Sequence, residues 1–134
     1  MNSAYGLGFQ RILEGSIAWL TDTIKVQFLD STHYTPALST DQFLSDIPGA
    51  ALVGSPQALA SKTTTLGVAN AANTTMPALV GSTVKYILIY KDTGVAATSP
   101  LICLLDTAAG LPFTPTGGDV VIQWDAGSFK IFQV

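Results

Sequence analysis

The chain has 134 residues, of which 48% are hydrophobic and 11% are charged, and its formal net charge is −3. This length is typical of one domain, which we expect to span residues 1–134, and the hydrophobic content excludes charge-driven disorder. The six Lys and Arg residues stand singly along the sequence, so no basic groove and no direct contact with nucleic acid is expected. One Cys and one His cannot complete a zinc site in a single chain, and no cofactor is expected.

The amino-terminal region predicts one short helix and a following strand. Helical spacing of four apolar residues favours an amphipathic helix at about residues 6–14: Leu7, Phe9, Ile12 and Leu13. A helix this short must pack its apolar face on a sheet or on a neighbouring chain, and we expect Trp19 to anchor that contact. Strict alternation of apolar and polar residues predicts a strand at 24–29. The first residues lack a secretory signal pattern and the apolar runs are too short to span a membrane, so no membrane association is expected.

The middle of the chain is poorer in large apolar residues. Residues 30–56 contain three prolines and polar turns, with a possible helical turn at 40–45 capped by Ser39 or Thr40. Residues 57–79 are rich in Ala, Thr, Ser and Asn, which suits thin exposed strands better than a core helix. Two interpretations of this Ala/Thr-rich segment stay open: a mobile loop, or a surface strand or arm that pairs with another subunit.

The second half predicts a β-meander over residues 83–134. Segments rich in β-branched and aromatic residues are separated by turns containing Gly, Pro and Asp. The expected strands are 84–90, 101–105, 119–124 and 129–134. The predicted fold class is therefore mainly β, an antiparallel β-sandwich or open barrel with one short N-terminal amphipathic helix.

No segment carries a complete catalytic motif, so we expect no catalytic residues and no enzyme activity. Asp92-Thr93-Gly94 is similar to the active-site triplet of retroviral-type aspartic proteases, but these residues also form common turns, and Lys91 precedes them. Aspartates at strand ends could in principle hold Ca²⁺, although their spacing matches no calcium loop and their turn-forming role is favoured. Cys103 lies in a predicted apolar strand, and we expect it to be a buried, inert thiol. The single histidine, His33, shows no recognisable catalytic spacing to it.

Several strand and turn segments resemble those of small structural proteins of tailed bacteriophages. The resemblance implies a virion component, and the size suggests a capsid cement or decoration protein on the outer capsid surface, made in the host cytoplasm. Such a protein would bridge major capsid protein subunits and contact copies of itself as a homo-oligomer. The resembling segments are 15–26, 90–94, 99–102, 106–107, 110–112, 115–120, 124–125 and 130–132.

The expected contact elements are the helical amino end and the Ala/Thr-rich segment. The candidate subunit-contact residues are Phe9, Ile12, Leu13, Trp19, Leu66 and Val68. An alternative hypothesis is a tail, neck or head-fibre protein of the virion. A third, from another class, is an aspartic protease that uses the Asp92-Thr93-Gly94 triplet.

Overall fold

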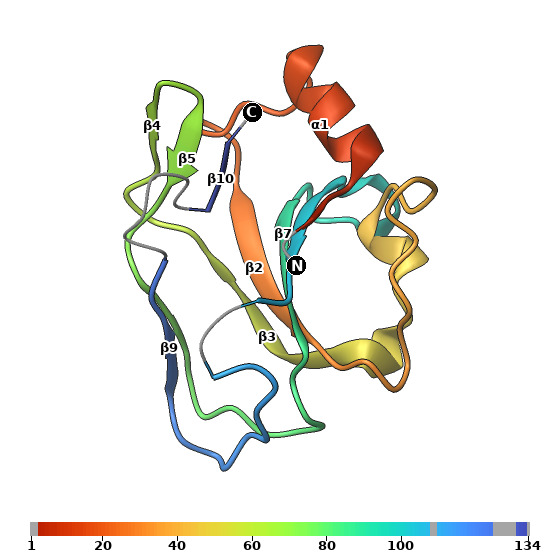
Figure 1. Ribbon diagram of the computed structural model, residues 1–134, viewed down its shortest axis with the longest axis vertical. Helices are drawn as coiled ribbons and strands as arrows, with labels where there is room; N and C mark the ends of the chain where they lie inside the picture. Colours follow the sequence, from red (N-terminus) through yellow and green to blue (C-terminus); the bar gives the residue numbers. More distant parts are fainter. Residues whose placement is uncertain (1–2, 108–109, 125–130, 134) are drawn as a thin grey trace.

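The computed structural model describes residues 3–107, 110–124 and 131–133. The protein is mainly β, with antiparallel strands and one short α-helix, and its sheets do not close into a barrel (Figure 1). This confirms the predicted fold class. The elements are β1 (Ser3–Ala4), α1 (Gly6–Leu13), β2 (Ile24–Leu29), η1 (Leu44–Asp46), η2 (Gly49–Ala51), β3 (Leu52–Ala58), β4 (Thr63–Thr65), β5 (Val68–Asn70), β6 (Thr74–Met76), β7 (Tyr86–Lys91), η3 (Ala96–Thr98), β8 (Leu101–Leu105), β9 (Val120–Ile122) and β10 (Phe132–Gln133).

The central layer is a five-stranded antiparallel sheet in the order β1-β8-β7-β2-β3. Strand β7 shows how it is built, because Ile87 and Ile89 join the core on one face while Leu88 and Tyr90 join the core on the other. Burial on both faces explains why the central strands read as continuous apolar runs. Where the pairing of β2 with β3 is irregular, the buried Gln27 side chain donates hydrogen bonds to the carbonyls of Val53 and Gly54, each at 3.0 Å.

Two different covers pack on this sheet. One face carries the larger core and is covered by the small sheets β10-β5-β4 and β6-β9, together with α1 and the segment at 14–23. The other face is covered by the segment at 30–51. A buried hydrogen-bond chain fixes this second cover, since the Tyr34 hydroxyl lies 2.8 Å from that of Tyr5 and donates to Asp41 at 2.6 Å.

The predicted helix at the amino end is confirmed as α1, and the predicted strand at 24–29 is confirmed as β2. Gly8 lets α1 lie directly against β8, because a Cβ at this position would overlap the carbonyl oxygen of Leu101. Only a residue without a side chain permits so close an approach of helix and strand. Among the described residues no helix has the length and apolar character needed to cross a membrane.

The predicted β-meander is wrong in its partners. Strands β7 and β8 do pair, but β9 pairs with β6 and β10 pairs with β5, far back in the chain. Turn residues mark where a chain reverses but do not specify which strand it meets, and a pairing this distant leaves no local pattern. Of the last predicted strand, residues 129, 130 and 134 lie outside the described residues, as does the predicted turn at 125–128.

The segment at 57–79 is folded onto the protein's own core. It forms β4, β5 and β6, and its inward side chains are buried, so the interpretation as a mobile loop is wrong, while the exposed β4 is a surface strand. These buried residues are Leu59, Ala69, Ala71, Thr74, Met76 and Leu79. Pairing of this segment with another subunit stays a prediction.

The helical turn expected at 40–45 lies slightly later, at η1. Neither Ser39 nor Thr40 caps it. Instead the Asp46 carboxylate accepts hydrogen bonds from the backbone N–H groups of Gln42 at 2.8 Å and Phe43 at 3.0 Å. These two bonds lower the pKa of the Asp46 carboxyl, because they stabilise its charged form.

Candidate interaction surface

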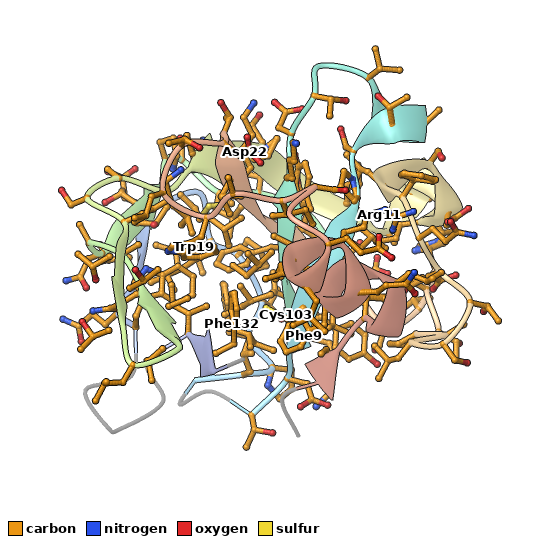
Figure 2. All side chains as sticks on the ribbon, turned by 90° about the horizontal axis from the view of Figure 1, so that it is seen from above. Phe9, Arg11, Trp19, Asp22, Cys103 and Phe132 are labelled. Carbon is orange, nitrogen blue, oxygen red and sulfur yellow. The ribbon has the colours of Figure 1, made fainter. Side chains whose placement is uncertain are left out.

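Three of the six candidate contact residues lie against the protein's own core. Trp19 is 8% exposed and its ring meets that of Phe132 edge-on, with centroids 5.2 Å apart. Phe9 lies on the other side of Phe132 at 5.3 Å, and Ile12 packs on the same core (Figure 2). The Trp19 indole N–H also donates to the Asn70 carbonyl at 3.3 Å. These aromatic contacts join α1, the segment at 14–23, β5 and β10 within one chain.

The other candidates reach the surface to different degrees. Leu66 is 93% exposed at the turn between β4 and β5, and Leu13 is 76% exposed at the end of α1. Val68, on β5 beside the turn, is half-buried. Leu20 is 54% exposed, and the sequence did not indicate this, because Leu20 follows Trp19 in an apolar run that is typical of buried residues.

We call Leu13, Leu20 and Leu66 the apical surface. The end of α1 and the turn of the β4–β5 hairpin lie at the same end of the molecule, uppermost in Figure 1. The segment at 14–23, which carries Leu20, joins them, since Trp19 reaches β5 through its indole N–H. The elements that carry these three exposed leucines therefore lie at one end of the fold.

Polar contacts hold the segment at 14–23 in place between α1 and the hairpin. The Asp22 carboxylate accepts the Ala18 N–H at 2.7 Å and pairs with the Lys91 ammonium at 3.1 Å. Lys91 also donates to the Ser16 carbonyl at 2.9 Å, and Lys62 donates to the carbonyl of Asp22. Burial by itself raises the pKa of the Asp22 carboxyl, but these hydrogen bonds and nearby lysines outweigh it and the pKa is lowered.

The hairpin that presents Leu66 has an unusual backbone for its sequence. Leu66 has φ 51° and Gly67 has φ 80°, so both central residues of the two-residue turn are left-handed, as in a type I′ turn. Asn-Gly is the preferred pair in such turns, because Asn tolerates the left-handed region and Leu does not. A leucine here costs about 1 kcal/mol of folding free energy relative to a residue suited to this backbone.

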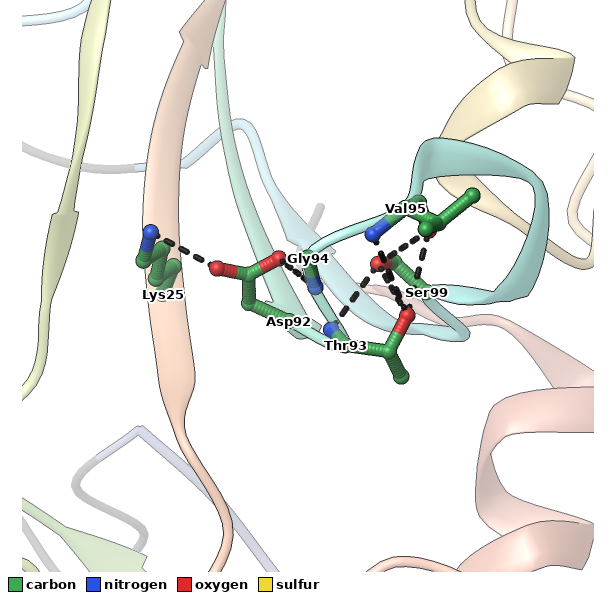
Figure 3. A network of polar contacts seen from close by, with 6 residues as sticks. All are labelled: Lys25, Asp92, Thr93, Gly94, Val95 and Ser99. Carbon is green, nitrogen blue, oxygen red and sulfur yellow. Dashed lines mark hydrogen bonds and ion pairs between the residues drawn. The ribbon is translucent and has the colours of Figure 1, made fainter.

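The Asp92-Thr93-Gly94 triplet is a structural turn (Figure 3). One Asp92 carboxylate oxygen accepts the Gly94 N–H at 2.9 Å, and the other pairs with the Lys25 ammonium at 2.7 Å. Gly94 has φ 87°, the left-handed conformation such turns require. The Lys25 hydrogen bond holds the pKa of the Asp92 carboxyl below its ordinary value. The predicted turn is confirmed, and its ion-paired carboxylate differs from the shared-proton carboxylates of an aspartic protease.

In the described part of the chain, the other reactive groups do not assemble into a site. His33 approaches the buried Asp30 carboxylate through its backbone N–H at 3.0 Å and its Nδ1 at 2.9 Å, a pair that the sequence analysis missed. Cys103 is buried as predicted, and burial raises the pKa of its thiol. Within the ranges that the structure describes, no three His, Cys, Asp or Glu side chains gather as metal ligands would.

The apical surface carries the two most exposed large apolar side chains of the described residues, Leu66 and Leu13. It combines strongly exposed apolar side chains with a hairpin backbone that its own sequence does not favour. Comparison with known proteins identifies no relative, since no protein-family model matches the chain and the search of curated proteins finds no match.

Proposed function

We propose that this protein is a virion structural protein of the cement or decoration type, which binds the outer capsid surface and bridges major capsid protein subunits. The apical surface would be the part that meets the shell. Copies of the chain would contact one another on the lattice as a homo-oligomer. The proposal joins the segment resemblance to phage structural proteins with the surface properties of the fold.

The observation that carries the proposal is Leu66. It is 93% exposed, and its left-handed backbone favours another residue type. An isolated exposed leucine is ordinary on a protein surface. A leucine that is both exposed and unfavourable for its own turn is better explained by a contact made outside the chain, where burying it contributes about 2 kcal/mol.

The composition supports a multi-subunit setting. Charged residues are 11% of the chain, well below the roughly 25% of an average soluble domain. Several lysines are also engaged within the chain, since Lys25 pairs with Asp92 and Lys91 with Asp22. The net charge of −3 suits an outward position away from nucleic acid.

The first test is the copy number in purified particles, measured by mass spectrometry against the major capsid protein. A ratio near one, or a simple lattice fraction of it, is expected for a protein that coats the shell. A few copies per particle would overturn the shell-coating role in favour of a tail, neck or head-fibre position. Absence from the particle would overturn the virion assignment.

The second test asks whether the apical surface makes the contact. Shells lacking the protein are mixed with the wild type, with Leu66→Asn, or with the control Val121→Asn. Val121 is 54% exposed on β9, towards the other end of the molecule (Figure 1). The wild type and the control should raise the temperature at which shells release DNA, because a ligand that binds only the intact shell stabilises it. Equal action of all three proteins would show that Leu66 is not at the contact.

A further inference from the structure

Strand β4 is an edge strand of the small sheet β10-β5-β4. It pairs with β5 through Thr63 opposite Asn70, Thr64 opposite Ala69 and Thr65 opposite Val68. On its other side no described residue pairs with it, and all three of its threonines are exposed. An edge of this kind offers backbone N–H and C=O groups to a further strand.

The turn determines which of those groups face outward. In a two-residue hairpin the residues that flank the turn, here Thr65 and Val68, form a hydrogen-bonded pair. Hydrogen-bonded and non-hydrogen-bonded pairs then alternate along the ladder. Thr64, one residue further along, therefore directs both its N–H and its C=O to the open side.

Apart from its shortness, β4 lacks the features that usually protect an edge. The outer strand of the central sheet, β3, contains Pro56 and an irregular register, both of which hinder further pairing. Strand β4 consists of Thr63–Thr65 alone, with no proline and no charge. Lys62 is the nearest charged residue before β4. Its ammonium group donates to the Asp22 carbonyl of its own chain and is therefore not free to repel another strand from the edge.

We infer that β4 pairs in antiparallel orientation with β4 of a second copy of this chain, about a twofold axis at Thr64. In this register Thr64 faces Thr64 of the second copy, and both exchange their outward N–H and C=O groups. Thr63 then lies opposite Thr65, a cross-strand pair of β-branched hydroxyl residues that is favourable in sheets. The small sheet continues from one copy into the next as β10-β5-β4-β4-β5-β10.

A second copy of this chain is the pairing partner that the properties of β4 favour. The edge carries no charge, so two identical strands meet without repulsion, and a twofold axis at its central residue satisfies both outward groups at once. The contact is short, so we expect weak association in solution, with a Kd of about 10⁻⁴ to 10⁻³ M. Attachment of neighbouring copies to one lattice would raise their effective concentration and make such a contact significant.

This inference rests on the proposed function, because it names the surface through which copies of the protein would contact one another on the shell. Its test uses the free protein and needs no virus particle. The free wild-type protein is followed by NMR diffusion and by exchange of the Thr64 amide up to about 1 mM. We expect concentration-dependent dimerisation together with slower exchange at Thr64. A protein that stays monomeric over this range would overturn the inference and leave the shell-binding proposal standing.

Charge substitution on the axis gives the decisive experiment. Thr64→Lys and Thr64→Glu should each weaken self-association at least about tenfold, because like charges then lie directly opposite one another. Mixing the two variants should restore association to the wild-type level or above, since a Lys now faces a Glu. Only a residue that meets its own counterpart has this behaviour, and the restored association also shows that both variants are folded.

The same substitutions at Val121, on strand β9, provide the matched control. Val121→Lys and Val121→Glu place charges on the edge of the other small sheet and should leave self-association unchanged. Loss of association with the Val121 variants and not with the Thr64 variants would assign the contact to β9 and overturn the inference. Failure of the mixed Thr64 variants to associate would place the twofold axis elsewhere, with the same consequence.

Discussion

The close approach of α1 to β8 makes Gly8 a position where one methyl group should destabilise the whole fold. In Gly8→Ala the added Cβ would overlap the carbonyl oxygen of Leu101 and lie 2.9 Å from the Cα of Ile102. Both neighbours are backbone atoms of β8, which is held between β1 and β7 and cannot shift easily. The helix would have to move away from the sheet and expose part of its apolar face.

The expected magnitude follows from two opposing contributions. Inserting a methyl group into a packed interior costs about 1–3 kcal/mol, and more when the neighbour is rigid. Alanine is the better helix former by about 1 kcal/mol, which offsets part of that cost. Because both neighbours are backbone atoms, the cost of insertion lies near the upper end of its range, and we expect Gly8→Ala to lower the free energy of unfolding by about 2 kcal/mol and the melting temperature by about 8 °C.

Urea unfolding followed by tryptophan fluorescence measures this change, and Gly6→Ala is the matched control. Gly6 lies in the same helix, and the nearest atom to its added Cβ is the Leu38 carbonyl oxygen at 3.9 Å, an ordinary contact. Gly6→Ala should be neutral or slightly stabilising. If the two variants unfold at the same urea concentration, α1 does not rest on β8 in the way described.

Three further results are expected. Leu66→Asn should stabilise the isolated protein by about 1 kcal/mol in urea unfolding, because Asn-Gly suits the turn. The same variant should bind shells roughly thirtyfold more weakly, because the contact loses the burial of a leucine. A destabilised variant would contradict the described turn. Asp92→Asn should cost at most about 1 kcal/mol at pH 7. Because the Lys25 ion pair lowers the pKa of Asp92, its stabilisation is complete above about pH 5 and is lost as the pH falls further, so the difference from wild type should shrink between about pH 5 and pH 2. A pH-independent difference would argue against the ion pair. Cys103 should react with a thiol reagent only in unfolding concentrations of urea, because it is buried and its pKa is raised; rapid labelling of the native protein would show an open core.

The elements that sequence reasoning predicted well are those with a local pattern. The helix at 6–14 has apolar residues at helical spacing and the strand at 24–29 alternates apolar and polar residues, and both were found within one residue of the expected bounds. The partners of β9 and β10 could not be predicted, since antiparallel pairing across a long loop depends on the whole fold rather than on neighbouring residues.

The candidate surface was predicted in part for the same reason. Leu13 and Leu66 were selected as apolar residues of the helical amino end and of the Ala/Thr-rich segment, and both are strongly exposed. Trp19 and Phe9 were selected on the same grounds, but their neighbour Phe132 comes from the far end of the chain and could not be foreseen. Burial of an apolar residue depends on what the rest of the fold places over it.

The pairing of β10 with β5 and of β9 with β6 also sets an order for folding during synthesis. The hairpin of β4 and β5 can form early, but the strands that complete the two small sheets are made later. Until they leave the ribosome, β6 lacks its partner, β5 is paired on one side only, and the face of the central sheet that these strands cover stays exposed to water. A nascent chain in this state exposes two open strands to its neighbours on the same messenger, so folding yield should depend on how densely the ribosomes are loaded.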